Sequence, residues 1–162
     1  MAFVVRRLAP ADAALFRTLR LRALQEAPDA FGASYAEEAD RPAAEWAAHL
    51  TSSAVFCVFA DDEAVGMAGL HRMGRDKVRH RAELWGMFVD TAWRGTPAAD
   101  TLIQALLDHA DGQVAQVELN VEAGNERAVC FYRRHGFVVC GRLPSAVRCA
   151  DGYRDELIMV RR

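Results

Sequence analysis

The stretch LNVEAGNERAVCFYRRHGF, residues 119–137, decides how this chain is interpreted. Its apolar start is typical of a strand, Asn125 is a suitable cap for a helix, and Gly136 ends that helix. Tyr132 follows Asn125 by seven residues, roughly two helical turns, so the two side chains lie on one face of the helix. An amide and a phenol side by side where a strand passes into a helix indicate a site more than a core.

Apolar periodicity and turn residues divide the rest of the chain into strands and helices. We expect strands at 3–7, 54–60, 64–73, 79–89, 114–121, 137–141 and 153–160, and helices at 10–26, 43–50, 97–110 and 125–135. Segments 27–41 and 142–152 are expected to be loops, because proline and glycine punctuate them. Gly86 lies inside the strand at 79–89, where an internal glycine often marks a bulge.

This order of elements, together with the helix that carries Asn125 and Tyr132, resembles the GCN5-related N-acetyltransferase (GNAT) superfamily. Members of that family transfer an acetyl group from acetyl-CoA to an amine. The resemblance runs from Phe3 to Arg161 and implies a single α/β domain over residues 1–162. The implied fold is a mixed, mostly antiparallel twisted sheet of about seven strands with a central, splayed parallel pair, flanked by about four helices.

Length and charge exclude several other classes of protein. A chain of 162 residues suits one domain with its own core, and a net charge of −2 leaves no basic footprint for nucleic acid. No apolar run approaches the roughly 20 residues that span a bilayer. Met1 to Arg7 lacks the apolar stretch of a signal peptide, so we expect a cytoplasmic protein that does not bind membranes.

The cysteines give no sign of a metal centre. Cys57, Cys130, Cys140 and Cys149 form no CxxC, and no histidine stands at zinc-ligand spacing from them. We therefore expect free thiols in a reducing compartment and no metal.

The turn between the strand at 79–89 and the helix at 97–110 is a candidate phosphate site. Thr96 is a suitable helix cap and Pro97 a suitable first helical residue, and the N–H groups at a helix start bind phosphate well. In the family the corresponding motif is Gln/Arg-x-x-Gly-x-Gly/Ala, which Arg94 and Ala99 match at its ends, whereas Pro97 replaces the central glycine. Proline has no N–H, so one phosphate donor is missing.

The resemblance assigns cofactor contacts on both sides of that turn. Arg94, Gly95, Thr96, Ala98 and Ala99 would hold the pyrophosphate, and the backbone of Met87, Phe88 and Val89 would run beside the pantetheine. Asn125 would contact the pantetheine arm, and Tyr132 would protonate the departing sulfur. The alternatives are an ordinary loop at 90–99, a plain cap at Asn125 and a half-buried structural tyrosine.

Glu83 is the candidate general base. A carboxylate in an otherwise apolar strand needs a reason, and its position resembles that of the base in the histone-type members. The alternative is a surface glutamate paired with a nearby arginine, with the amine losing its proton through water.

The acceptor pocket would be built from the loops that the family fixes least. These are 27–41, which carries Phe31 and Tyr35, and 142–153. Asp151, Asp155 and Glu156 near the latter could attract a cationic amine, although turn and strand-surface charges describe them as well.

The sequence therefore predicts an acetyl-CoA-dependent N-acetyltransferase that acts by direct attack in a ternary complex. Acetyl-CoA would be a co-substrate, and the acceptor would be a primary amine of a small molecule or peptide. A homodimer is consistent with the resemblance. The rivals are a CoA-binding sensor or scaffold without turnover, which Pro97 favours, and a structural domain without a cofactor.

Overall fold

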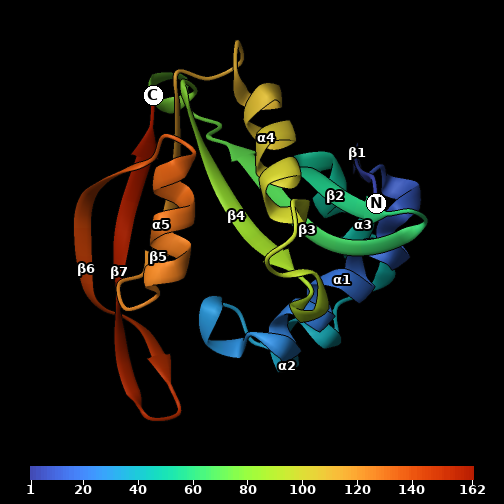
Figure 1. The fold of residues 1–162 in the computed structure, drawn as a ribbon, viewed down its shortest axis with the longest axis horizontal. Coiled ribbons are helices and arrows are strands. Elements are labelled where there is room, and N and C mark those ends of the chain that lie inside the picture. The colour runs from blue at the N-terminus through green and yellow to red at the C-terminus, as the bar shows by residue number, and fades with distance from the viewer. The chain divides into compact units, whose positions relative to one another are not determined.

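The computed structural model describes residues 1–162 as two compact units, one of residues 1–71 and 84–111 and the other of residues 72–83 and 112–162. Figure 1 shows the seven strands and five helices. The strands are β1 (Phe3–Arg7), β2 (Ala54–Ala60), β3 (Glu63–Arg72), β4 (Arg81–Val89), β5 (Gln116–Glu122), β6 (Val138–Cys149) and β7 (Gly152–Arg161). The helices are α1 (Ala13–Glu26), α2 (Tyr35–Ala39), α3 (Ala43–Ser52), α4 (Ala98–Ala110) and α5 (Glu126–Arg134).

The strands form one sheet in the order β1-β2-β3-β4-β5-β7-β6. β4 and β5 are parallel, while β1 with β2, β2 with β3, β5 with β7 and β6 with β7 are antiparallel. The predicted mixed sheet with a central parallel pair is therefore confirmed. The parallel register covers only Arg81 to Glu83 against Gln116 to Glu118, and β4 does not pair with β5 beyond Glu83.

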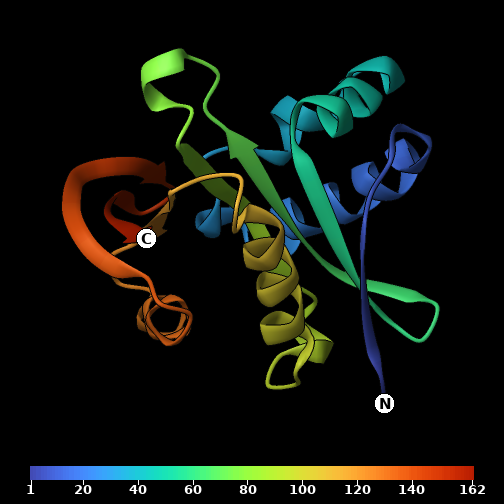
Figure 2. The same cartoon turned by 90° about the horizontal axis from the view of Figure 1, so that it is seen from above.

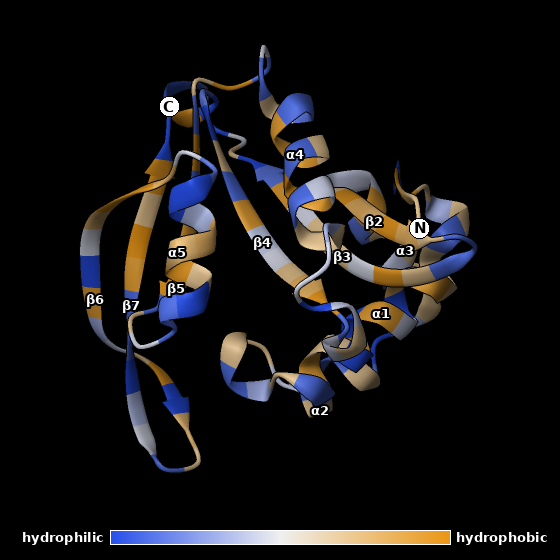
Figure 3. Ribbon diagram, in the orientation of Figure 1, coloured by the Kyte–Doolittle hydropathy of each residue, from blue (hydrophilic) through white to orange (hydrophobic).

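In the first unit, β2 is buried on both faces and is apolar along its length (Figure 3). Successive side chains of a strand point to opposite faces. Cys57 accordingly packs in one core with Phe16 of α1 and Trp46 of α3, whereas Phe56 places its ring 5.3 Å from that of His109 on α4. Figure 2 shows α3 and α4 on opposite sides of β2.

Helix α4 buries the face that its periodicity predicts. Its buried residues include Leu102, Ile103, Leu106, Leu107 and Ala110, as expected from the spacing of these apolar side chains. Burying each leucine stabilises the fold by about 1.5–3 kcal/mol relative to leaving it exposed. The first unit thus holds the start of α4 firmly at the end of β4.

The second unit is built around β5 and a long β6–β7 hairpin (Figure 1). The expectation of a loop over 142–152 is wrong, because β6 continues to Cys149 and the chain turns only at Ala150 and Asp151. The register shifts between Leu143 and Val147, around Pro144. Proline is tolerated there because β6 is an edge strand, where a missing N–H breaks no interior ladder.

The expectation of a loop over 27–41 is also wrong in part. A 3-10 turn occupies Pro28–Ala30, and α2 follows it. Ser34 caps α2 by accepting a hydrogen bond from Glu37 N at 3.3 Å, and Glu37 Oε2 accepts one from Ser34 N at 2.9 Å. This capping box is readable in the sequence as Ser-x-x-Glu, but only five residues follow it as a helix.

The cysteines are free, as expected. Burial raises the pKa of the Cys57 thiol to about 12, whereas Cys130 and Cys140 are exposed. No group of histidine, cysteine and carboxylate side chains is arranged to hold a metal ion. None of the helices has the length and apolar character needed to cross a membrane.

Trp85 of β4 lies directly on Gly69 of β3, and this contact yields a test of the packing. A Cβ at position 69 would overlap the indole of Trp85. We expect Gly69→Ala to lower the free energy of unfolding by about 1–3 kcal/mol, the usual penalty of overpacking. Denaturant unfolding monitored by circular dichroism measures the change.

Gly74→Ala is the matched control, because nothing lies within 4 Å of a Cβ at that position. Equal stability of the two variants would contradict the close approach of Trp85 to Gly69.

Candidate active site

The end of β4 passes into the turn that the sequence predicts as a phosphate site. After Val89 the chain makes the 3-10 turn Thr91–Trp93, and Gly95 then adopts a positive φ of 76°, which glycine takes without strain. Thr96 Oγ1 donates to Trp93 O at 2.5 Å and accepts from Ala98 N at 3.4 Å. The predicted cap is therefore one residue early, since α4 begins at Ala98 and Pro97 holds the cap position.

Few donors of this turn remain open. Arg94 N bonds Thr91 O, Thr96 N bonds Trp93 O, and Ala98 N bonds the Thr96 hydroxyl. Pro97 has no N–H. The amides of Gly95 and Ala99 make no hydrogen bond within the chain, and the Arg94 side chain is exposed. With the positive end of the α4 dipole, these groups can hold a phosphate, although Asp100 adds a negative charge to the first helical turn.

Asp90 anchors the turn and is a residue that the sequence reasoning missed. It is only 9% exposed, and Arg22 Nη1 of α1 donates to its Oδ2 at 2.8 Å. Its N–H donates to Val65 O and its carbonyl accepts from Trp93 N. Burial raises the pKa of Asp90, and the Arg22 guanidinium offsets part of that rise. The sequence did contain a signal for Asp90, because it is a carboxylate that directly follows an apolar strand.

In the second unit, α5 carries Asn125 and Tyr132. Asn125 caps the helix, since its Oδ1 accepts from Ala128 N at 3.2 Å, while its Nδ2 donates to no group of the chain. Tyr132 is 8% exposed, and its ring packs on those of Phe131 and Phe137. Burial raises the pKa of Tyr132, so the phenol keeps its proton throughout the neutral range. Burial is the one cause of that rise, and no hydrogen bond within the chain contributes to it.

Glu83 lies on β4 within the second unit and is not paired with an arginine. Arg81 instead donates two hydrogen bonds to Glu118 of β5, at 2.8 and 2.6 Å. Asp155 and Asp151 are paired with Arg142 and Arg154.

Glu156 of β7 is the carboxylate that interacts with Glu83. Burial raises the pKa of Glu156, and the negative charge of Glu83 raises it further. No ion pair joins Glu156 to a cation, so its surroundings favour the protonated carboxyl or an ammonium group nearby. The sequence reasoning mentioned Glu156 but treated it as a surface charge.

The predicted acceptor residues Phe31 and Tyr35 lie in the first unit. Tyr35 is the first residue of α2 and is 40% exposed. The Phe31 ring stacks on the guanidinium of Arg20, whose carbon lies 5.2 Å from the ring centre. Arg20 is 8% exposed and donates from Nε and Nη2 to Glu38 of α2 at 2.9 and 3.2 Å.

Sequence reasoning also missed Arg20. The signal was a charged residue one helical turn after Phe16, within the apolar stripe of α1.

Met87, Phe88, Val89 and the turn Arg94–Ala99 lie in the first unit, together with Phe31 and Tyr35. Glu83, Asn125 and Tyr132 lie in the second. The strand that carries Glu83 and Met87–Val89 and the helix that carries Tyr132 are present as predicted, whereas Tyr35, predicted in a loop, begins α2. Gly86 has a positive φ of 64° immediately before Met87, as expected of an irregularity in β4.

The model of the Acetyltransferase (GNAT) family matches residues 20–137. The chain belongs to this family. Its members are acetyltransferases that use acetyl-CoA, and the seven-stranded mixed sheet is the GNAT fold. No protein with a curated description matches the sequence.

Solved structures of GNAT acetyltransferases resemble this chain over nearly its whole length. A GNAT acetyltransferase from Streptococcus pneumoniae is 20% identical, with a TM-score of 0.87 and 99% of each chain covered. A ribosomal-protein-alanine N-acetyltransferase from Brucella melitensis is 22% identical, with a TM-score of 0.80 over 98% of each chain. The putative acetyltransferase yncA from Salmonella typhimurium, solved with its cofactor acetyl-CoA, is 18% identical, with a TM-score of 0.80 over 99% of this chain and 93% of that one.

The Arg20–Glu38 ion pair gives a stability prediction for this GNAT protein. Glu38→Gln should lower the free energy of unfolding by about 3 kcal/mol, because it leaves a buried guanidinium without its counter-charge. Replacing both residues, Arg20→Met with Glu38→Leu, should recover most of that loss, since both charges are removed together.

Urea unfolding measures the two variants against Glu45→Gln, a change at an exposed carboxylate of α3. If Glu38→Gln were as stable as Glu45→Gln, the burial of the pair would be disproved.

Proposed function

We propose that this GNAT protein transfers an acetyl group from acetyl-CoA to a primary amine of a small molecule or peptide, by direct attack in a ternary complex. The observation that carries the proposal is Tyr132, a buried phenol whose hydroxyl has no partner in the chain. The phenol carries a proton at neutral pH that it can give to a departing thiolate; its raised pKa keeps it protonated but makes it a weaker acid, so the assignment rests on its position and its unbonded hydroxyl. Its place on α5, seven residues after the cap Asn125, is the one that the family resemblance predicts.

The turn before α4 would hold the pyrophosphate of CoA. The open amides of Gly95 and Ala99, the Arg94 guanidinium and the α4 dipole support this role. Thr96 and Ala98 shape the turn through their mutual hydrogen bond. Backbone groups of Met87, Phe88 and Val89 would contact the pantetheine, since β4 has no parallel partner beyond Glu83. Asn125 Nδ2 would contact the same arm.

Acetyl-CoA supplies the acetyl group as a thioester that the amine can attack. The attacking amine must be uncharged, so an ammonium acceptor first loses a proton, and Glu83 would take it. The charge of Glu83 raises the pKa of Glu156, so a second carboxylate lies within electrostatic reach of the proposed base. Tyr132 would donate its own proton to the sulfur as the carbon–sulfur bond breaks, and solvent would restore it. The protonated Glu83 would return its proton to solvent.

Pro97 supports a second candidate, a CoA-binding sensor without turnover, because the turn lacks one donor. Release of free CoA thiol from acetyl-CoA, measured against an amine library with mass spectrometry of the products, separates the two. Turnover with at least one amine is expected. A thermal shift with CoA but no thiol release with any amine would favour the sensor, and no shift at millimolar CoA would argue against both.

Tyr132→Phe should lower kcat by about 10²-fold or more, the usual contribution of a general acid, while the Kd for CoA stays nearly unchanged. Tyr153→Phe is the matched control, because it removes an exposed phenol from the hairpin. Steady-state kinetics and calorimetric titration with CoA give the two quantities. An unaltered kcat in Tyr132→Phe would remove the acid assignment.

Pro97→Gly should tighten CoA binding by up to about tenfold, because it restores an N–H that can donate to a phosphate oxygen. Pro144→Gly on β6 is the control for a general effect of losing a proline. Calorimetric titration measures both variants. Unchanged or weaker binding in Pro97→Gly would show that the turn accommodates the proline without loss.

A further inference from the structure

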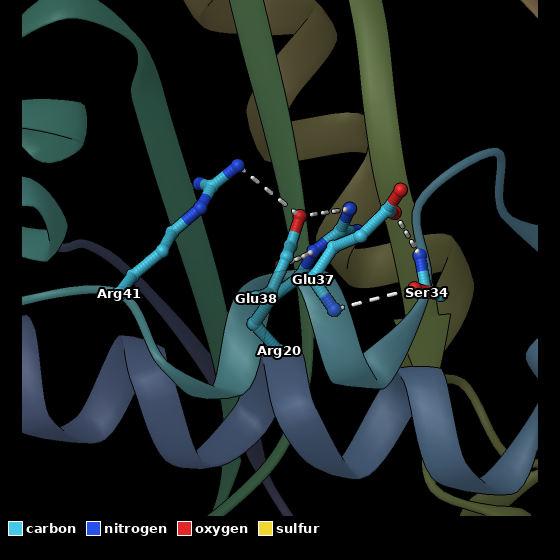
Figure 4. Close-up of polar contacts among 5 residues, drawn as sticks. All are labelled: Arg20, Ser34, Glu37, Glu38 and Arg41. Carbon is cyan, nitrogen blue, oxygen red and sulfur yellow. Dashed lines mark hydrogen bonds and ion pairs between the residues drawn. The ribbon is translucent and has the colours of Figure 1, made fainter.

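Arg20 is a charged side chain in the middle of an otherwise apolar helix face. Glu38 holds two of its nitrogens, and its flat guanidinium stacks against Phe31 at 5.2 Å and Trp85 at 5.7 Å. Figure 4 shows Glu38 between Arg20 and Arg41. Glu38 thus fixes the Nε–Nη2 edge of the guanidinium, and the two aromatic rings fix its plane. The remaining nitrogen, Nη1, is held in one position as a result.

That remaining nitrogen, Nη1, donates to no group of the chain. The polar side-chain atoms that are fully enclosed without a partner are Trp46 Nε1 and Asp90 Oδ1. Nη1 is not among them, and the Arg20 side chain keeps 10% of its surface exposed, so solvent reaches Nη1. Nη1 also lies 3.4 Å from where a Cβ of Gly86 would stand. Two N–H donors are therefore open beside Gly86, which precedes Met87.

Glu38 does not serve Arg20 alone. Its Oε1 lies 3.8 Å from Arg41 Nη2 as well as accepting from Arg20, and Glu37 is a second carboxylate that interacts with Arg41. The neighbouring His49, whose ring lies 4.8 Å from that of Trp85, also interacts with these charges. Burial lowers the pKa of His49, and the charges of Arg41 and Arg20 lower it further, against the opposing charge of Glu38.

A purely structural role explains this arrangement poorly. A buried ion pair adds little stability compared with apolar residues of the same size, so a pair that only joined α1 to α2 would gain nothing from its charges. Nor would such a pair leave an open nitrogen on the side of β4. An arginine held by a carboxylate on one edge, with its other edge open, is arranged to donate charge-assisted hydrogen bonds to an anion.

We infer that Arg20 Nη1 binds a carboxylate of the acceptor, so that the acetylated amine belongs to a compound such as a free amino acid rather than to a polyamine or an aminoglycoside. The inference rests on the proposed function and names its substrate class. Phe31, which belongs to the predicted acceptor segment, holds the guanidinium in place from one face. A polycationic acceptor has no anionic group to accept from Nη1 and would bring further positive charge beside Arg20.

The test compares free amino acids with their amides and with the corresponding decarboxylated amines, using thiol release from acetyl-CoA by the full chain. The free acid should exceed its amide in kcat/KM by about tenfold or more, as for a hydrogen bond to a charged group. In Arg20→Gln this ratio should fall close to one. Arg17→Gln, at an exposed arginine of the same helix, should leave the ratio unchanged.

Two further variants distinguish loss of the carboxylate site from misfolding. Arg20→Lys keeps the charge but loses the planar fork, so the ratio should fall only in part. The pair Arg20→Met with Glu38→Leu removes both charges and should lose the preference while remaining folded by circular dichroism.

The outcomes separate this inference from the proposed function. Turnover with equal rates for acids and amides would overturn the carboxylate site and leave the acetyltransferase intact. A preference for a phosphonate analogue over the carboxylate would overturn the choice of anion. If no amine is acetylated, amino-acid binding measured by calorimetry decides, and binding that Arg20→Gln does not weaken overturns the inference.

Discussion

The constraint on which the rest depends is the early end of the parallel pairing between β4 and β5. Pairing covers Arg81 to Glu83 and then stops, although β4 continues to Val89. Buried backbone N–H and C=O groups are almost always bonded, so the unpaired edge of β4 needs a partner other than a strand. Gly86 follows on the same strand with a positive φ. An extended amide-bearing molecule such as pantetheine would satisfy this need.

Charge is distributed differently in the two units. In the first unit, Glu38 contacts both Arg20 and Arg41, whereas in the second unit the charge of Glu83 raises the pKa of Glu156. An acceptor with a carboxylate would suit the open nitrogen of Arg20. Because net charge is only −2, such local groups, and not a global field, would select the acceptor.

The sequence predicted those parts of the structure that depend on local pattern. β2 was expected at its observed bounds, and α5 with its cap at Asn125 followed from one continuous stretch. β6 was cut short because Val138, Val139 and Leu143 are exposed in an edge strand, so no alternation of apolar and polar residues marks it. Arg20 and Glu156 were not identified as site residues because their partners, Glu38 and Glu83, are distant along the chain. Which charges remain unpaired is decided by the fold and cannot be read from a single segment.

The contact between Trp85 and Gly69 also restricts how this protein can diverge. The indole fills the space that any side chain at position 69 would need, so a larger residue there becomes tolerable only after Trp85 has been replaced by something smaller. The two substitutions can accumulate in one order but not in the other. Because Trp85 also stacks on Arg20, a lineage that took this route would lose part of the support for its guanidinium and could drift toward different acceptors.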